Sequence, residues 1–157
     1  MKRQLLTIMT VLSLIGVVPQ SSAQTQAEMK KLGSELDNVL NNLGPVSGNI
    51  NGMVLGVEPD LGWADLALSS IMQVSDDYQE VSSYGLLAEQ MRDPRDYQIV
   101  LRRMRIKCNY AKKTAERATT SLNSTLVRLT SIALITEITR ARELIQLLRG
   151  NALCAEQ

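Results

Sequence analysis

The sequence predicts an all-α protein: an elongated bundle of three to four amphipathic helices with a C-terminal helical hairpin, after a cleaved signal peptide. Apolar residues recur at steps of three and four along most of the chain, which is the spacing of one helix face. No segment alternates apolar and polar residues for long enough to indicate a sheet. The N-terminus has the composition of a secretory signal.

Residues 1–23 form the predicted signal peptide. Lys2 and Arg3 give a short basic start, residues 5–18 are uncharged and mostly apolar, and Ala23 ends a run of small residues. The apolar stretch is shorter than the ~20 residues that cross a bilayer. We therefore expect cleavage before Gln24. Residues 24–157 are then a single helical domain that is exported, either periplasmic or secreted.

The first helix of the mature chain is predicted over residues 25–43. Thr25 and Glu28 have the spacing of a capping box, a hydroxyl at the N-cap and a carboxylate at N3. One apolar seam follows, made of Met29, Leu32, Leu36, Val39 and Leu43. Gly44 and Pro45 are expected to end the helix.

Residues 44–59 are predicted as a Gly-rich connection. Gly44, Gly48, Gly52 and Gly56 repeat at every fourth residue, and residues 38–57 carry no charge. We favour a loop, and the alternative is a helical glycine ridge that packs closely or enters a membrane. Connections this long are often functional. Its apolar residues form a candidate binding segment: Ile50, Met53, Val54, Leu55 and Val57.

Two further helices are predicted over residues 60–91 and 94–121. The seam of the first comprises Ala64, Ala67, Ile71, Val74, Tyr78 and Val81, widened by Leu68 and Met72. Asp93 and Pro94 suit the N-cap and N1 positions of the second. Its seam alternates steps of four and three, as in a coiled coil: Tyr97, Leu101, Met104, Cys108, Ala111, Ala115, Ala118 and Leu122.

A register change after Leu122 predicts a hairpin. The seam would next meet Thr125 and other polar residues, whereas a new apolar stripe contains Val127, Leu134, Ile138, Ala141, Ile145 and Leu148. We place a turn near residues 120–124 and a fourth helix over 124–149, with Gly150 as the C′ residue. The alternative is one continuous helix over residues 94–149.

The hairpin brings the two cysteines within reach of each other. From a turn near Leu122, Cys108 lies ~21 Å back along one helix, and the tail beyond Gly150 can fold back toward it. A disulfide is the default in an exported protein, so we predict a Cys108–Cys154 bridge. Two unpaired thiols are the alternative.

The charges are unevenly distributed along the chain. Residues 24–91 carry two basic and ten acidic residues, whereas residues 92–117 carry nine basic and three acidic ones, so the net charges are −8 and +6. The candidate face for an anionic partner consists of Arg102, Arg103, Arg105, Lys107, Lys112 and Lys113. We favour internal pairing of the acidic helix with the basic one, and the alternative is a cationic surface for lipid headgroups or another polyanion.

No catalytic, metal or cofactor site is predicted. The chain contains no His, which excludes Ser–His and Cys–His relays, and it has no Walker or Rossmann glycine motif. We expect no enzyme, no cofactor and no nucleic-acid partner.

The expected function is a non-catalytic interaction through helix faces, with a protein partner or with a second copy. The alternative is a cationic or amphipathic binder of membrane surfaces or anionic polymers, in peripheral contact with a membrane. The plan of signal peptide, Gln-rich start and long amphipathic helices resembles that of helical envelope proteins, including minor pilus components of conjugative secretion systems. This resemblance implies a component of an envelope or secretion assembly and assigns no residue a role.

Overall fold

The computed structural model describes residues 21–54 and 58–154, with the side chains of residues 26–54 and 59–154. Most of the predicted signal peptide, residues 1–20, lies outside this range. The described residues form an all-α bundle of four helices, α1 (Ser21–Val54), α2 (Leu61–Gln90), α3 (Pro94–Leu126) and α4 (Ile132–Arg149), with the short 3₁₀ helices η1 (Glu58–Asp60) and η2 (Ala152–Cys154). The predicted fold class is confirmed.

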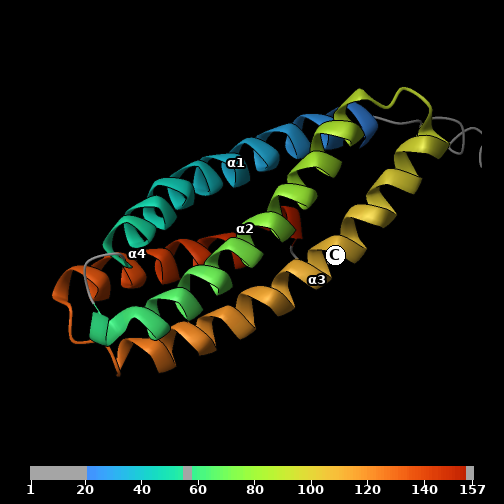
Figure 1. Ribbon diagram of the computed structural model, residues 1–157. Helices are drawn as coiled ribbons and strands as arrows, with labels where there is room; N and C mark the ends of the chain where they lie inside the picture. The colour runs from blue at the N-terminus through green and yellow to red at the C-terminus, as the bar shows by residue number, and fades with distance from the viewer. Residues whose placement is uncertain (1–20, 55–57, 155–157) are drawn as a thin grey trace, which may run out of the picture.

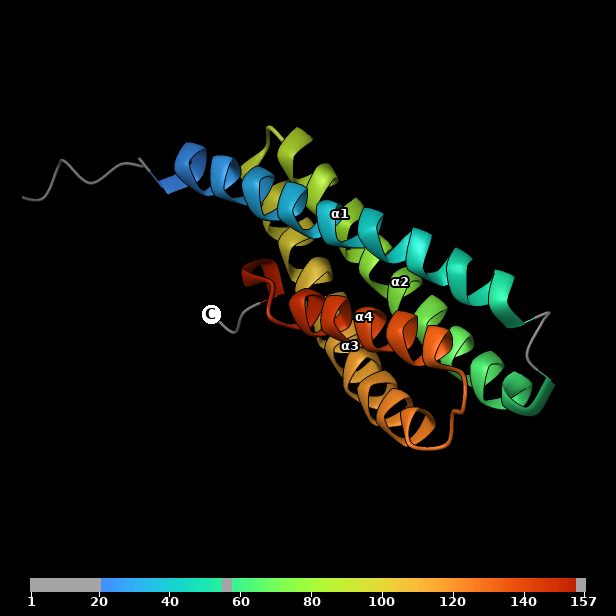
Figure 2. The ribbon, with the colours of Figure 1, turned by 90° about the vertical axis from the view of Figure 1, so that its left-hand side faces the viewer.

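The four helices pack as an elongated bundle (Figure 1). Each helix contacts the next along the chain, and α4 returns to contact α1. Figure 2 shows α1 and α4 toward the viewer, with α2 and α3 behind them. One continuous core of buried side chains runs between the four helices.

Helix α1 is longer than predicted at both ends. It begins at Ser21, before the expected capping box at Thr25, and continues through Gly44 and Pro45 to Val54. The prediction of a loop over residues 44–59 is therefore wrong for residues 44–54. Residues 55–57 of that segment lie outside the described part of the chain.

Burial explains why α1 does not end at Pro45. A proline in a helix interior removes one backbone hydrogen bond and costs about 3 kcal/mol. Beyond it, Val46, Ile50 and Val54 continue the apolar seam and are all at most 8% exposed. Burying one such side chain contributes about 1.5–3 kcal/mol, so the three together outweigh the proline.

Helices α2 and α3 follow the predicted pattern closely. All six residues of the predicted α2 seam are buried, although Met72, expected to widen it, is exposed. The Asp93 side chain accepts a hydrogen bond of 2.7 Å from the Arg95 backbone N–H, and Pro94 is the first residue of α3. The predicted α3 seam is buried except for Leu101, which is half-buried.

The hairpin between α3 and α4 is confirmed, so the single long helix is excluded, but the turn lies later than predicted. Helix α3 ends at Leu126 and α4 begins at Ile132. The Thr119 and Thr120 hydroxyls donate to backbone carbonyls one turn earlier, so these polar residues remain helical. Val127, predicted in the α4 seam, lies in the turn and is 82% exposed.

A buried carboxylate holds this turn in place. Asp60 is 1% exposed and occupies the N-cap position of α2, but its side chain makes no cap bond to α2. It instead accepts hydrogen bonds from the Thr130 backbone N–H (2.9 Å), the Thr130 hydroxyl (3.1 Å) and the Ser131 backbone N–H (2.7 Å). The Asp60 carboxylate thus joins the start of α2 to the start of α4.

A second contact joins the same two parts of the chain. The Arg128 guanidinium lies 4.5 Å from the centre of the Trp63 ring, within the range of a cation–π interaction. Ser131 is the N-cap of α4, and its hydroxyl accepts a hydrogen bond from the Leu134 backbone N–H. The α3–α4 turn is therefore held both by α2 and by its own cap.

The far end of α4 is fixed by the disulfide. Gly150 is the C-cap residue of α4, with φ −83°, and not the C′ residue that was predicted. The chain then turns back through η2, and Cys154 bonds to Cys108 as predicted, with their Cα atoms 5.2 Å apart. Both cysteines are buried, and Leu153 beside them packs over Gly85 of α2.

The short length of α4 leaves part of the bundle with only three helices. Helix α4 has 18 residues and α3 has 33, and Figure 1 shows α4 beside only part of α3. Toward Pro94 from Cys108, α3 extends beyond the end of α4. Leu101 lies in this part, which accounts for its half-buried side chain.

We predict that loss of the disulfide destabilises the protein strongly. Cys108→Ser and Cys154→Ser should each lower the free energy of unfolding by roughly 2–4 kcal/mol. The double variant should lose little more than either single variant, because all three lack the same bond. Urea unfolding of the non-reduced proteins measures this. Two free thiols in the wild type by mass spectrometry would contradict the pairing.

We predict that Asp60 makes stability depend on acidic pH. Burial favours a higher pKa for Asp60, but the hydrogen bonds from Ser131 and Thr130 lower it below the usual value. The bonds therefore stabilise the fold above the unfolded-state pKa, about 4, and this stability is lost as the pH falls through the lower folded-state pKa. Asp60→Asn should lower the urea midpoint at pH 7, and the difference from wild type should shrink below about pH 4.

Glu143→Gln provides the matched control, because Glu143 is an exposed carboxylate of α4, the helix whose start Asp60 holds. It should leave the midpoint almost unchanged at both pH values. A constant difference between wild type and Asp60→Asn across this pH range would contradict the role of the Asp60 charge.

Candidate functional site

Helix α3 has two sides of opposite character. Its seam packs into the core, and residues 97–115 of the helix include no Asp or Glu. The side opposite the seam is exposed along this stretch. We call it the α3 outer face and define it by Ile99, Arg102, Arg103, Ile106, Tyr110 and Lys113, all exposed.

Three large apolar side chains lie in one row on the α3 outer face. Ile99, Ile106 and Tyr110 are 53%, 55% and 69% exposed. Their steps of seven and four residues keep them on one side of the helix. Arg102 and Lys113 lie along the same row, over a length of ~21 Å from Ile99 to Lys113. The face therefore combines apolar area with positive charge.

The structure divides the six predicted basic residues between two environments. Lys107 faces α2, where its Nζ lies 2.6 Å from Glu80 Oε1, and this hydrogen bond raises the pKa of Lys107. Lys112 is half-buried, and Arg102, Arg103, Arg105 and Lys113 are exposed. The preferred prediction of internal pairing thus holds for Lys107, whereas Arg102, Arg103 and Lys113 belong to the α3 outer face.

A second ion pair joins α1 to the C-terminal end of α2. Lys30 of α1 lies 2.9 Å from Glu89, and the hydrogen bond between them raises the pKa of Lys30. Both ion pairs are partly exposed, so each contributes little free energy and mainly helps select neighbouring helices.

The predicted apolar binding segment is wrong where the structure describes it. Ile50 and Val54 are buried in the core, and Met53 is half-buried against it. Leu55 and Val57 lie outside the described residues. Ile50, Met53 and Val54 were expected to be free because the segment was predicted as a loop, but α1 continues to Val54 and turns these three side chains inward.

The glycine ridge is helical but packs against nothing in the described structure. Gly44, Gly48 and Gly52 are exposed, and a Cβ at any of them would meet no atom within 4 Å. Gly56 lies outside the described range. Over residues 21–54 and 58–154, no helix is both long enough and apolar enough to cross a membrane.

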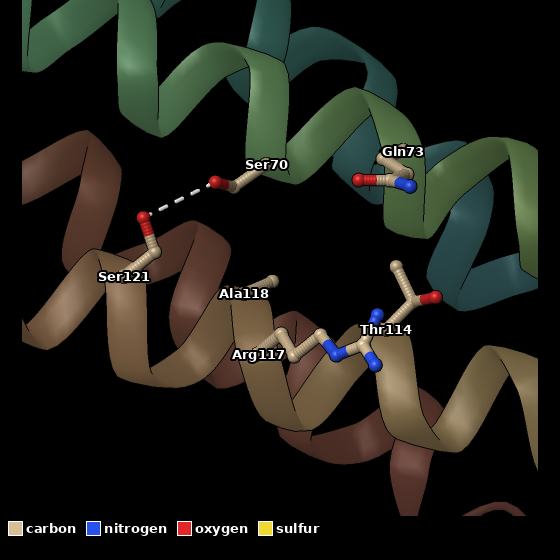
Figure 3. A pocket seen from close by; sticks show the side chains of 6 residues that line it. All are labelled: Ser70, Gln73, Thr114, Arg117, Ala118 and Ser121. Atoms are coloured by element: carbon tan, nitrogen blue, oxygen red, sulfur yellow. Dashed lines mark hydrogen bonds between the residues drawn. The ribbon is translucent and has the colours of Figure 1, made fainter.

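A polar hollow of about 150 Å³ lies between α2 and α3. Figure 3 shows Ser70 and Gln73 on one side, and Thr114, Arg117 and Ser121 on the other. The Ser70 hydroxyl donates to the Ser121 hydroxyl at 3.2 Å, and no carboxylate lines the hollow. A serine here has no base to accept its proton, so the arrangement does not activate a nucleophile.

The core contains one fully buried tyrosine. Burial raises the pKa of Tyr78 to about 12, so its hydroxyl stays protonated at neutral pH. Within the described chain, this hydroxyl has no hydrogen-bond partner. The same part of the chain has no group of three or more Cys, Asp or Glu residues placed to hold a metal ion.

Ile99, Ile106 and Tyr110 are the residues that the sequence analysis missed. The prediction of a cationic face considered charge alone. The sequence does indicate their exposure. These three residues do not follow the spacing of the α3 seam, and basic residues surround them in the sequence. Large apolar residues off the seam of an amphipathic helix are exposed when no other element covers that side.

No protein-family model, curated protein or solved structure matches this chain.

We predict that Lys107 and Arg102 respond differently to charge reversal. Lys107→Glu should lower the melting temperature modestly, because it removes the ion pair with Glu80 and places two carboxylates together. At a protein concentration low enough to keep copies of the chain apart, Arg102→Glu, on the outer face of the same helix, should leave the melting temperature almost unchanged. Thermal unfolding followed by circular dichroism compares the two. An equal loss in both variants would mean that the α3 outer face takes part in folding.

Proposed function

We propose that this chain is an exported, non-catalytic interaction protein that binds a protein partner through the α3 outer face. One observation carries the proposal: Ile99, Ile106 and Tyr110 are all more than half exposed in one row among basic side chains. Contiguous apolar area on a protein surface, bordered by polar residues, is typical of an interaction site. Aromatic and arginine side chains are also those that contribute most to protein interfaces.

Export is part of the proposal. The composition of residues 1–23 is that of a secretory signal peptide, and the Cys108–Cys154 disulfide suits an oxidising compartment. A component of an envelope or secretion assembly fits these properties, because such a component acts by contact with its neighbours. N-terminal sequencing of the exported protein should begin at or close to Gln24.

A non-catalytic role is supported by the chemistry of the described side chains. The sequence provides no His, the serines of the α2–α3 hollow bond to each other, and the pKa of the core tyrosine is shifted away from neutrality. Acid–base catalysis near pH 7 needs a group whose pKa lies close to that value.

The alternative partner for the same face is an anionic membrane surface or polymer. The basic residues favour either kind of partner. The acidic side chains Asp65 and Asp76 are exposed on the neighbouring helix α2, and they would be repelled by an anionic surface close to α3. We therefore propose a protein partner.

We predict that loss of two apolar side chains from this face weakens partner binding. Ile106→Ala/Tyr110→Ala should weaken capture of the partner from an envelope extract at least ~10-fold, because truncating central apolar contacts often costs more than 1 kcal/mol each. Val127→Ala/Leu147→Ala truncates two still more exposed apolar side chains elsewhere, and this variant should bind as the wild type does. Immobilised mature protein and quantitative mass spectrometry measure both.

The second part of this experiment measures binding to vesicles of anionic phospholipid at two salt concentrations. Under this proposal, vesicle binding stays near background at both. Capture that is unchanged in Ile106→Ala/Tyr110→Ala would contradict the proposed face. Strong, salt-sensitive vesicle binding lost in that variant would identify a membrane surface as the partner instead.

A further inference from the structure

Helix α2 carries an exposed row whose charge is opposite to that of α3. Asp65, Met72 and Asp76 lie on the outer side of α2, away from its buried seam, and Met72 is 53% exposed. Among the ion pairs of the described residues, none includes Asp65 or Asp76. We call these three residues the α2 acidic row. It is an apolar side chain between two free carboxylates.

The α2 acidic row and the α3 outer face match in spacing when read in opposite directions. On α3, Arg102, Ile106 and Lys113 are separated by steps of four and seven residues. On α2, Asp76, Met72 and Asp65 are separated by the same steps in reverse. At 1.5 Å per residue, both rows have their apolar side chain ~6 Å from one charge and ~10 Å from the other.

The two rows cannot meet within one copy of the chain. Helices α2 and α3 are neighbours in the bundle, but they contact each other through other sides. Their facing residues include Glu80 with Lys107 and Ser70 with Ser121. Those contacts leave the α2 acidic row and the α3 outer face pointing outward.

We propose that the partner of the α3 outer face is a second copy of this chain, bound through its α2 acidic row. The two helices dock antiparallel, so that Arg102 lies opposite Asp76, Ile106 opposite Met72, and Lys113 opposite Asp65. At this contact one copy contributes Ile106 and two positive charges, and the other contributes Met72 and two negative charges. The inference rests on the proposed function, and it names the partner of the same face.

Charge complementarity favours a second copy over an anionic surface. A membrane would attract Arg102 and Lys113, but it would leave Asp65 and Asp76 close to negative lipid headgroups. A second copy satisfies both rows with residues already present in the chain. If two copies bind each other through both rows at once, they form a closed dimer. If each copy binds a different neighbour through each row, longer assemblies form.

Charge exchange tests the inference by analytical ultracentrifugation of the oxidised mature protein. The wild type should self-associate with rising concentration, and less so at high salt. Arg102→Asp/Lys113→Asp and Asp65→Lys/Asp76→Arg should each weaken the association constant at least ~100-fold, because each places like charges opposite one another. The variant with all four substitutions should regain association.

Mixing provides a sharper test of the same pairing. Each double variant alone presents two rows of like charge, whereas an equimolar mixture again contains rows of opposite charge. The mixture should therefore associate although neither variant does. Arg92→Asp/Arg140→Asp reverses two exposed basic residues outside both rows, and it should associate as the wild type does. Circular dichroism spectra of all variants should match, since every substituted side chain is exposed.

Three results would overturn the inference. They are a wild type that stays monomeric at all concentrations, double variants that associate unchanged, and a four-substitution variant that fails to recover. A monomeric wild type that still loses envelope capture in Ile106→Ala/Tyr110→Ala would refute self-association and leave the proposed function standing. A monomeric wild type whose capture is unaffected by those substitutions would refute both.

Discussion

The Asp60 carboxylate is the contact on which the arrangement of the bundle depends. It lies at the start of α2 yet accepts its hydrogen bonds from Thr130 and Ser131, 70 and 71 residues further along the chain. It therefore fixes where the α3–α4 turn sits against the first half of the protein. The disulfide fixes the other end of α4 against the middle of α3. With both ends held, α4 covers one side of α3, α2 covers another, and the opposite side remains open.

The uneven charge distribution of the sequence reaches the surface of the bundle on the outer sides of α2 and α3. The charges of the acidic and basic segments are only partly paired with each other inside the bundle, through Glu80 with Lys107. The remaining charges lie outward, negative on α2 and positive on α3. Because Met72 and Ile106 are exposed between them, the two outer rows resemble the two halves of a helix–helix contact. This resemblance is the physical basis for the proposal that the chain acts by assembly.

Much of the fold could be predicted from helical periodicity, because a buried seam leaves a regular trace in the sequence. The seams of α2 and α3, the Asp93 cap and the cysteine pairing were all predicted. Gly44 and Pro45 misled the prediction because local propensity was weighed without the burial of Ile50 and Val54, which outweighs it. The turn was misplaced because threonines can bond to their own helix. The role of Asp60 left no local signal, since its partners are distant in sequence. The positive charge of the candidate face was foreseen, but its apolar row was not.

Cross-linking between copies tests the central claim most directly, namely that the α2 and α3 outer rows of different molecules pair antiparallel. Equal amounts of unlabelled and nitrogen-15-labelled protein would be mixed, treated with a zero-length carbodiimide reagent and digested. Links between Lys107 and Glu80 within one copy serve as the internal standard, because those side chains lie 2.6 Å apart. The account predicts links of mixed isotope composition between Lys113 and Asp65. Cross-links found only within single copies, and none between Lys113 and Asp65, would contradict this pairing.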